Sequence, residues 1–189
     1  MSGGSVFYVN AICNGLDALP DADPVWRAEL TARLAEEGVE SLAEELKRLD
    51  PVSWASIDIR NGHRVVRALE VFLQTGKPFV SFRLTEPKPR SFDIEKICLT
   101  RPREELYKRI DRRVLKMMDD GLVDEVRSLS GFRDLPALRT VGYREIFDYL
   151  DGNIPLDEAI RLIQRNTRHY AKKQLTWWKR DPAVKCVEL

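Results

Sequence analysis

The stretch that most constrains the fold is an amphipathic segment at residues 156–180, LDEAIRLIQRNTRHYAKKQLTWWKR. Its two acids, Asp157 and Glu158, stand at the start, and every later charged residue is basic. Acids in the first turn and bases toward the end suit the helix dipole. At about 100° per residue, five of the bases fall within a sector of about 60°; they are Arg161, Arg165, Arg168, Lys172 and Lys179. The spacing predicts one long helix with a single positive stripe.

The side opposite the stripe carries Ala159, Ile163, Tyr170 and Trp177, which predicts an apolar back packed on a core. Solvated helix faces usually mix charges of both signs, and this one does not. The pattern therefore favours a polyphosphate ligand such as RNA. An ordinary solvated basic face remains the alternative on sequence alone.

The positive charge of the chain is localised. The whole sequence has a net charge of +1, while residues 159–180 carry +7 and leave −6 on the remainder. Such a concentration is the footprint of a bound anion rather than of general basicity. The three cysteines, at positions 13, 98 and 186, are far apart and lack histidines at metal spacing. They predict a reducing compartment without a zinc site or a disulfide framework.

No apolar run approaches the roughly 18 residues of a membrane span, and no signal-peptide pattern is present. We therefore expect a cytoplasmic protein without a membrane partner and without metal ligands of its own.

Residues 21–87 are predicted to form a small helical subdomain. Asp23 before Pro24 is typical of an N-cap followed by proline at the first helical position. Ser41, with Glu44 three residues later, predicts a capping box at the start of a second helix.

A third helix is predicted between Asn61 as its cap and Gly76 as its C-terminal stop. Arg64 and Arg67 share one side of it, next to His63. They are candidates for binding an anion, and ordinary surface residues are the alternative.

Residues 95–100 (EKICLT) predict a short buried strand that leads into a helix from about residue 103 to 120. Arg109 and Arg113 share one side of that helix. Arginines near the start of a helix that follows a strand suit an anion site in an α/β domain. Intrahelical pairs with Glu105 and Asp111 are the alternative. Residues 184–189 predict a final short strand.

Residues 137–144 (ALRTVGYR) hold Gly142 between Val141 and Tyr143. The glycine lets another backbone approach closely, and the tyrosine offers a face for stacking on a base. A loop glycine and a core tyrosine are the alternative. The sequence contains no G-x-x-x-x-G-K-[ST] and no H-E-x-x-H motif. The residues alone thus indicate a mostly helical α/β protein that binds RNA or another polyphosphate.

Four strings extend this reading: HRVVRALEVFLQTGKPF, LYKRIDRRVLKMMDDGLVDEV, TVGYREIFDYLDG and TRHYAKKQLTWWKR, in that order. With them the chain resembles the tRNA dimethylallyltransferases, also called tRNA isopentenyltransferases. The opening GGSVFY and the following ALPDADP are similar to the family's Gly-Gly-Thr/Ser segment and the loop after it. The resemblance covers essentially the whole chain.

The resemblance implies an α/β, predominantly helical fold: the C-terminal part of a P-loop-type, nucleotide-binding core at residues 1–20 and 88–189, with a helical insertion domain at residues 21–87. It also implies transfer of a dimethylallyl group from dimethylallyl diphosphate to N6 of adenosine 37 in tRNA, with Mg²⁺ as cofactor. The partners would be the anticodon stem-loop of tRNA and the diphosphate donor, and a monomer is expected.

By position, the resemblance assigns the diphosphate to Arg113 and Arg109. It assigns tRNA contacts to His63, Arg64, Arg67, Arg139, Thr140, Val141, Gly142, Tyr143, Arg144, Arg168, Lys172, Lys173, Gln174, Thr176, Trp177 and Lys179.

The sequence also departs from the family. The phosphate-binding loop and the aspartate expected as general base are absent from the 189 residues. Val6 and Phe7 precede Tyr8 where the family has glycine and an apolar residue, and Lys173 replaces the usual arginine. We therefore expect a truncated, inactive tRNA-binding portion with no catalytic residue in this chain. A non-catalytic RNA-binding module and a prenyltransferase of free adenine nucleotides are the alternatives, although the long basic stripe favours tRNA.

Overall fold

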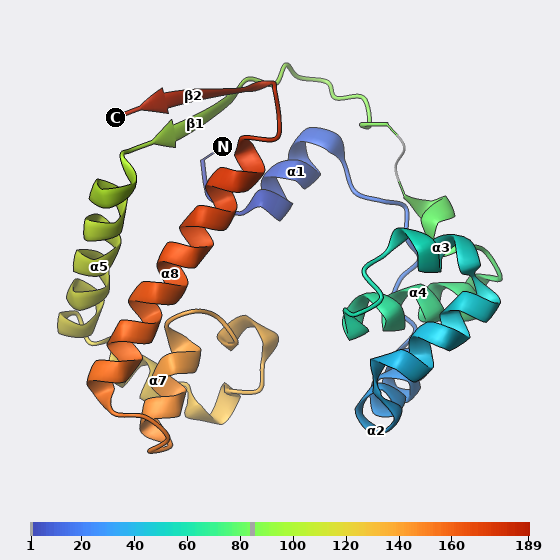
Figure 1. The fold of residues 1–189 in the computed structure, drawn as a ribbon, viewed down its shortest axis with the longest axis horizontal. Coiled ribbons are helices and arrows are strands. Elements are labelled where there is room, and N and C mark those ends of the chain that lie inside the picture. The colour runs from blue at the N-terminus through green and yellow to red at the C-terminus, as the bar shows by residue number, and fades with distance from the viewer. Residues whose placement is uncertain (1, 84–85) are drawn as a thin grey trace. The chain divides into compact units, whose positions relative to one another are not determined.

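The computed structural model describes residues 2–83 and 86–189. They form two compact units, one of residues 7–92 and one of residues 1–6 and 93–189 (Figure 1). The first unit is helical, and the second combines helices with two parallel strands. A predominantly helical α/β fold was predicted, and the structure confirms a mostly helical chain whose two strands form a small parallel sheet. The described part of the chain contains no helix that is long and apolar enough to cross a membrane.

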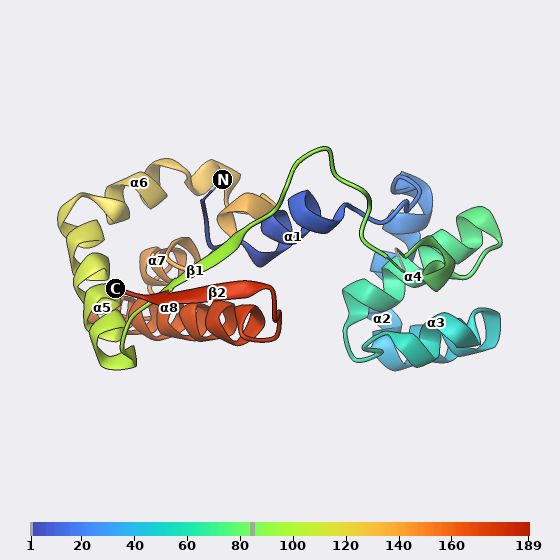
Figure 2. The same cartoon turned by 90° about the horizontal axis from the view of Figure 1, so that it is seen from above.

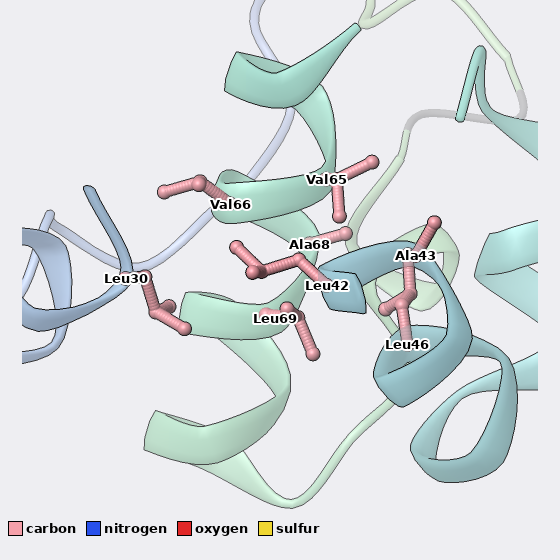
Figure 3. Close-up of a cluster of buried hydrophobic side chains, with 8 residues drawn as sticks. All are labelled: Leu30, Leu42, Ala43, Leu46, Val65, Val66, Ala68 and Leu69. Atoms are coloured by element: carbon pink, nitrogen blue, oxygen red, sulfur yellow. The ribbon is translucent and has the colours of Figure 1, made fainter. Parts of the chain in front are cut away.

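The helical unit contains α2 (Pro24–Leu49), α3 (Pro51–Ser56) and α4 (Gly62–Thr75), and α1 (Val6–Asn14) begins at its boundary. A short 3-10 turn, η1 (Phe79–Phe82), follows α4. The core lies between α2 and α4 (Figure 3). Its buried side chains are Leu30, Leu42, Ala43 and Leu46 from α2, and Val65, Val66, Ala68 and Leu69 from α4. Burying each leucine contributes roughly 1.5–3 kcal/mol, so this apolar face holds the unit together.

The caps predicted for these helices are confirmed. The Asp23 carboxylate accepts the backbone N–H groups of the first turn of α2. The Asn61 side chain accepts the N–H of Arg64 at the start of α4. Gly76 ends α4 with φ of 67°, a left-handed conformation that glycine adopts without a steric penalty.

The capping box predicted at Ser41 is wrong. The Ser41 hydroxyl donates to Glu37 at 2.7 Å, across a kink inside α2, and does not cap a new helix. The kink lies at Gly38, where φ is 83° and ψ is 172°. This conformation is essentially restricted to glycine, so Gly38 and not Ser41 sets the break.

The second unit contains β1 (Lys96–Thr100), α5 (Arg103–Asp119), α6 (Leu122–Ser128), α7 (Tyr143–Leu150), α8 (Leu156–Trp178) and β2 (Val184–Glu188). Two short 3-10 turns, η2 (Ser130–Phe132) and η3 (Pro136–Leu138), lie between α6 and α7. The strands β1 and β2 pair in parallel, with Lys96 opposite Val184 and Thr100 opposite Glu188, and lie side by side in Figure 2. Both predicted strands and the long helix over 156–180 are confirmed.

The prediction that the first strand is buried is wrong. Ile97 and Leu99 are 57% and 62% exposed. Within the described residues, β1 pairs only with β2. Ile97 and Leu99 do not belong to the hydrophobic core of this unit.

The core of the second unit lies among α5, α6, α7 and α8. Its buried side chains are Val114, Leu122, Val126, Ile146, Phe147, Ala159 and Ile163. α8 packs against both α5 and α7, so its first half is held inside the unit while its second half extends past this core.

Candidate nucleic-acid interface

Two of the basic side chains in the positive stripe of α8 form ion pairs with nearby carboxylates. Arg161 pairs with Glu158 at 2.6 Å on the same helix. Arg168 pairs with Asp111 of α5, and its guanidinium lies 5.9 Å from the Tyr107 ring. These two bases, which the sequence places on a one-signed face, are therefore already matched by carboxylates.

The second half of α8 is different. Lys172, Lys173, Lys179 and Arg180 are exposed, and among residues 2–83 and 86–189 none of them forms an ion pair with a carboxylate. We call these four residues the cationic end of α8. Closely spaced free bases attract a polyanion, because each phosphate they neutralise releases condensed counterions.

The apolar back predicted for α8 holds only in its first half. Ala159 and Ile163 are buried as predicted, but Tyr170 and Trp177 are 52% and 45% exposed, so that part of the prediction is wrong. The reason is that the side chains of α5, α6 and α7 in the core reach α8 only as far as Ile163.

Trp177 instead lines a pocket of about 510 Å³ on the surface of α8. The other lining residues are His169, Lys172, Lys173, Thr176 and Arg180. An exposed indole among basic side chains can stack on a nucleobase while the lysines and the arginine neutralise phosphates. His169 and Arg180 were not among the predicted tRNA contacts, although Arg180 follows Trp177 by three residues and Thr176 by four, a helical spacing that predicts this side.

Two further predicted residues have local roles in α8. Gln174 donates through Nε2 to the carbonyl of Gly4 at 2.6 Å, which ties the start of the chain to the helix. Thr176 donates its hydroxyl to the carbonyl of Lys172 at 2.9 Å.

A second pocket, of about 440 Å³, lies where β1 and β2 end. It is lined by Thr100, Arg101, Arg103, Leu106, Tyr107, Lys172, Leu175, Thr176, Lys179, Cys186 and Glu188. Ligands of parallel sheets bind outside the carboxyl ends of the strands, so the position is suited to an anion. Because Lys172 and Thr176 line both pockets, the two form one basic surface around the end of α8.

The loop before α7 is held by Glu145, which the sequence analysis did not single out. Gly142 has φ of 103° and donates its N–H to the Glu145 carboxylate at 2.8 Å. Asn166 of α8 donates to the same carboxylate at 2.6 Å, and Arg144 does so at 3.3 Å. Burial alone would raise the pKa of Glu145, but the hydrogen bonds from Asn166 and Gly142 outweigh it and lower that pKa.

Of the predicted residues in this loop, Arg139, Thr140 and Arg144 are exposed. Val141 and Tyr143 pack against the core of the unit. The Tyr143 hydroxyl donates to Glu125, and this bond raises the pKa of the phenol. Tyr143 thus packs as the alternative interpretation, a core tyrosine, expects. Stacking of its ring on a nucleobase stays a prediction.

Arg109 and Arg113 are exposed on α5, one turn apart. The alternative of intrahelical pairs does not form, because Glu105 pairs with Arg101 and Asp111 pairs with Arg168. Both guanidiniums are therefore accessible to an anion, and their role toward a diphosphate stays a prediction.

The remaining predicted residues lie in the other unit, at the start of α4. His63 and Arg64 are exposed. Arg67 is held against buried Glu70 at 3.1 Å and also donates to the carbonyl of Pro20. The Glu70 carboxylate also pairs with Arg27 and accepts the N–H of Asp23. This network holds the start of α2 against α4.

The Mg²⁺ implied by the sequence resemblance finds no fitting donor set here. In the part of the chain that the structure describes, no group of three or more His, Cys, Asp or Glu side chains converges as metal ligands. Asp111 of α5 and Glu158 of α8 are paired with arginines. These residues therefore do not make a magnesium site by themselves.

Comparison with known proteins gives a consistent result. The family described as IPP transferase matches residues 1–181. A tRNA dimethylallyltransferase of Porphyromonas gingivalis is 51% identical over 185 residues, covering 98% of this chain and 62% of that protein. One of Cytophaga hutchinsonii is 48% identical over 183 residues, covering 97% of this chain and 60% of that protein. The chain thus spans about 60% of the length of these curated relatives.

Two solved structures are similar as well. The full-length tRNA isopentenylpyrophosphate transferase of Bacillus halodurans has a TM-score of 0.59 and 38% identity, covering 97% of this chain and 57% of that one. A eukaryotic dimethylallyltransferase acting on tRNA has a TM-score of 0.75 and 21% identity, covering 98% of this chain and 50% of that one. At that low identity the second likeness supports the fold alone.

Proposed function

The chain belongs to the IPP transferase family, and on that premise we propose that it is the tRNA-binding portion of a tRNA dimethylallyltransferase. In the proposed reaction a dimethylallyl group passes from dimethylallyl diphosphate to N6 of adenosine 37, beside the anticodon. The observation that carries the proposal is the cationic end of α8, whose free bases surround the exposed ring of Trp177.

The proposed grip combines charge with stacking. Lys172, Lys173 and Lys179 neutralise backbone phosphates of the anticodon stem-loop, and Trp177 offers its ring to an unstacked base. Arg161 and Arg168 contribute less, because carboxylates already match their charge.

The other predicted contacts are part of the same proposal. The loop from Arg139 to Arg144 meets the RNA next to α8, held in place by Glu145. In the helical unit, His63 and Arg64 have exposed side chains for this role. Arg67 supports them by donating to the carbonyl of Pro20, which holds the segment before α2 against α4.

For the chemistry, we propose that Arg109 and Arg113 offset the charge that gathers on the departing diphosphate. The adenine must leave its stack to reach the prenyl donor. The proposed contacts of α8 with the anticodon stem-loop would hold the RNA while it does so. Magnesium, which the sequence resemblance implies, would supply further charge compensation when bound. We assign no step to it in these residues, because they do not form a site for it.

We propose that residues 1–20 and 88–189 belong to a P-loop-type core and residues 21–87 to a helical insertion domain, and that the chain acts as a monomer. The 189 residues contain no phosphate-binding loop motif. We therefore expect no dimethylallyl transfer to an anticodon stem-loop by this chain alone, measured with radiolabelled donor. Detectable transfer would contradict this part of the proposal and leave the RNA-binding part standing.

The binding proposal is tested by titrating salt against the affinity for an anticodon stem-loop. Log affinity should fall steeply with log salt, by about 0.9 for each duplex phosphate that is neutralised. The double variant Lys172→Gln, Lys173→Gln should reduce that slope by about 2 and weaken binding for all stem-loop sequences.

Arg161→Gln is the matched control on the same helix. Its guanidinium is already paired with Glu158, so the slope should stay close to that of the parent chain. A flat slope for the parent chain, or equal losses in both variants, would count against the RNA grip. Tight binding of free adenine nucleotides with a flat slope would instead favour a prenyltransferase that acts on mononucleotides.

A further inference from the structure

Two cysteines that are distant in the sequence meet in the parallel sheet. Cys98 of β1 lies opposite Cys186 of β2 in the register of the strand pair. Neighbouring strands are about 4.7–4.9 Å apart, and directly opposed residues of a parallel pair point to the same face. A disulfide requires Cα atoms about 4.4–6.8 Å apart, so the strand spacing suits one.

The two thiols differ in their access to solvent. Cys186 is exposed and lines the pocket beside Lys172 and Lys179, whereas Cys98 is half-buried. Burial and, after it, the neighbouring Cys186 thiol raise the pKa of Cys98. The third cysteine, Cys13, is buried in the helical unit.

We propose that Cys98 and Cys186 are an oxidisable dithiol that closes to an intramolecular disulfide when the protein meets a peroxide. The sequence predicted no disulfide framework, because the spacing of the cysteines along the chain hides the pairing that the strand register creates. The proposal concerns a reversible bond between existing free thiols and does not depend on RNA binding.

The chemistry balances with hydrogen peroxide as the oxidant. The thiolate of exposed Cys186 attacks one peroxide oxygen, the O–O bond breaks, and the departing hydroxide takes up a proton as water. The sulfenic acid that forms is then attacked by the thiolate of Cys98. The S–S bond forms as the S–O bond breaks, and the second oxygen leaves as water. Two thiols and one peroxide thus give one disulfide and two waters.

The bridge would join β1 to β2 beside the basic surface. β1 leads into α5, and β2 follows α8, so the disulfide would link the strands that flank both helices. One of its two sulfurs, that of Cys186, lines the pocket that contains Lys172 and Lys179. Closing a long loop in this way restricts the unfolded chain, so the oxidised protein should unfold at a higher temperature than the reduced one.

The test treats the full 189-residue chain with hydrogen peroxide and counts free thiols under denaturing conditions. We expect the count to fall from three to one, with a mass loss of two hydrogens and full reversal by dithiothreitol. Proteolytic mapping should show the Cys98 and Cys186 peptides linked to each other in the treated chain and separate in the untreated chain. The rate of bridge formation should not depend on protein concentration.

Cys13→Ser is the control variant that should still form the bridge, while Cys98→Ser and Cys186→Ser should not. Circular dichroism of each reduced variant checks its folding, and the peptide map of the parent chain stands without any variant. A bridge that includes Cys13, disulfides between two chains only, or conversion of Cys186 to sulfinic acid without a bridge would overturn the proposal.

Discussion

Glu145 illustrates how one buried carboxylate organises a candidate binding loop. It is 2% exposed and accepts hydrogen bonds from Gly142, Arg144 and Asn166. Two of these partners belong to the loop before α7 and its first turn, while Asn166 belongs to α8. The residue therefore fixes the loop that we propose to contact RNA to the helix that we propose to grip it.

Replacing Glu145 with alanine should destabilise the second unit. The buried N–H of Gly142 loses its acceptor, which costs about 2 kcal/mol of unfolding free energy. Urea denaturation followed by circular dichroism measures the loss. Glu158→Ala is the control, because that carboxylate makes only an exposed pair with Arg161 and should change stability much less. Equal effects of the two substitutions would contradict the role given to Glu145.

The lowered pKa of Glu145 predicts a pH dependence with a definite sign. Because the folded state holds the proton less tightly than the unfolded state, the stabilisation is present above the ordinary value of 4.5 and is lost as pH falls through the lower folded pKa. The unfolding free energies of the parent chain and of Glu145→Gln should therefore differ most near neutral pH and converge in acid. Curves that stay parallel from neutral to acid pH would refute this.

At the scale of elements, the basic residues that α8 carries in its sequence differ from those that remain without a carboxylate partner in the fold. The sequence places seven bases from Arg161 to Arg180 with no acid among them. The packing of α5 against α8 gives Arg168 a carboxylate partner, and the first turn of α8 gives one to Arg161. Of the other bases in the described part of the chain, Arg165 is exposed and donates to Asn166, and the remaining four lie at the C-terminal end of the helix beside the exposed Trp177.

Trp177→Ala should weaken binding of the anticodon stem-loop by about tenfold, since stacking of one base on an aromatic ring contributes roughly 1–3 kcal/mol. Tyr170→Ala is a matched control: an aromatic on the same helix with similar exposure that lines neither pocket. Fluorescence anisotropy at fixed salt measures both. If Tyr170→Ala weakened binding as much as Trp177→Ala, the stacking role of Trp177 would be wrong.

At the scale of the whole molecule, the residues that the structure describes form two separate cores. One lies between α2 and α4 and the other among α5, α6, α7 and α8. Each buries its own apolar side chains, so each unit should have its own stability. The proposed reaction draws on both, with the grip of α8 in one unit and His63 and Arg64 in the other.

Core truncations should therefore act on one unit at a time. Leu46→Ala should lower the stability of the helical unit by about 2–5 kcal/mol and leave the other nearly unchanged, and Ile146→Ala should do the reverse. Amide hydrogen exchange, read separately over α4 and α7, measures each unit, and the two variants serve as controls for each other. Equal loss of protection in both units from either variant would show that they unfold together.

Several elements could be predicted from sequence because their causes are local. The Asp23 and Asn61 caps, the stop at Gly76 and the extent of α8 depend on residues within a few positions of one another. The tRNA-binding residues were assigned by resemblance to a family that the comparisons support, and their individual roles stay predictions.

Only the tertiary structure decided which groups in these elements are available. The pairing of Arg168 with Asp111, of Arg27 with Glu70 and of Cys98 with Cys186 each joins residues that are distant in the sequence. The exposure of Trp177 depends on where the packed core ends along α8. Helical periodicity and caps act over one or two turns, so the sequence by itself determined the helices and the position of the basic stripe. Ion pairs between elements, burial and strand register depend on how distant segments pack, and that packing matched Arg168 with Asp111 and left Trp177 exposed beside the unpaired bases at the end of α8.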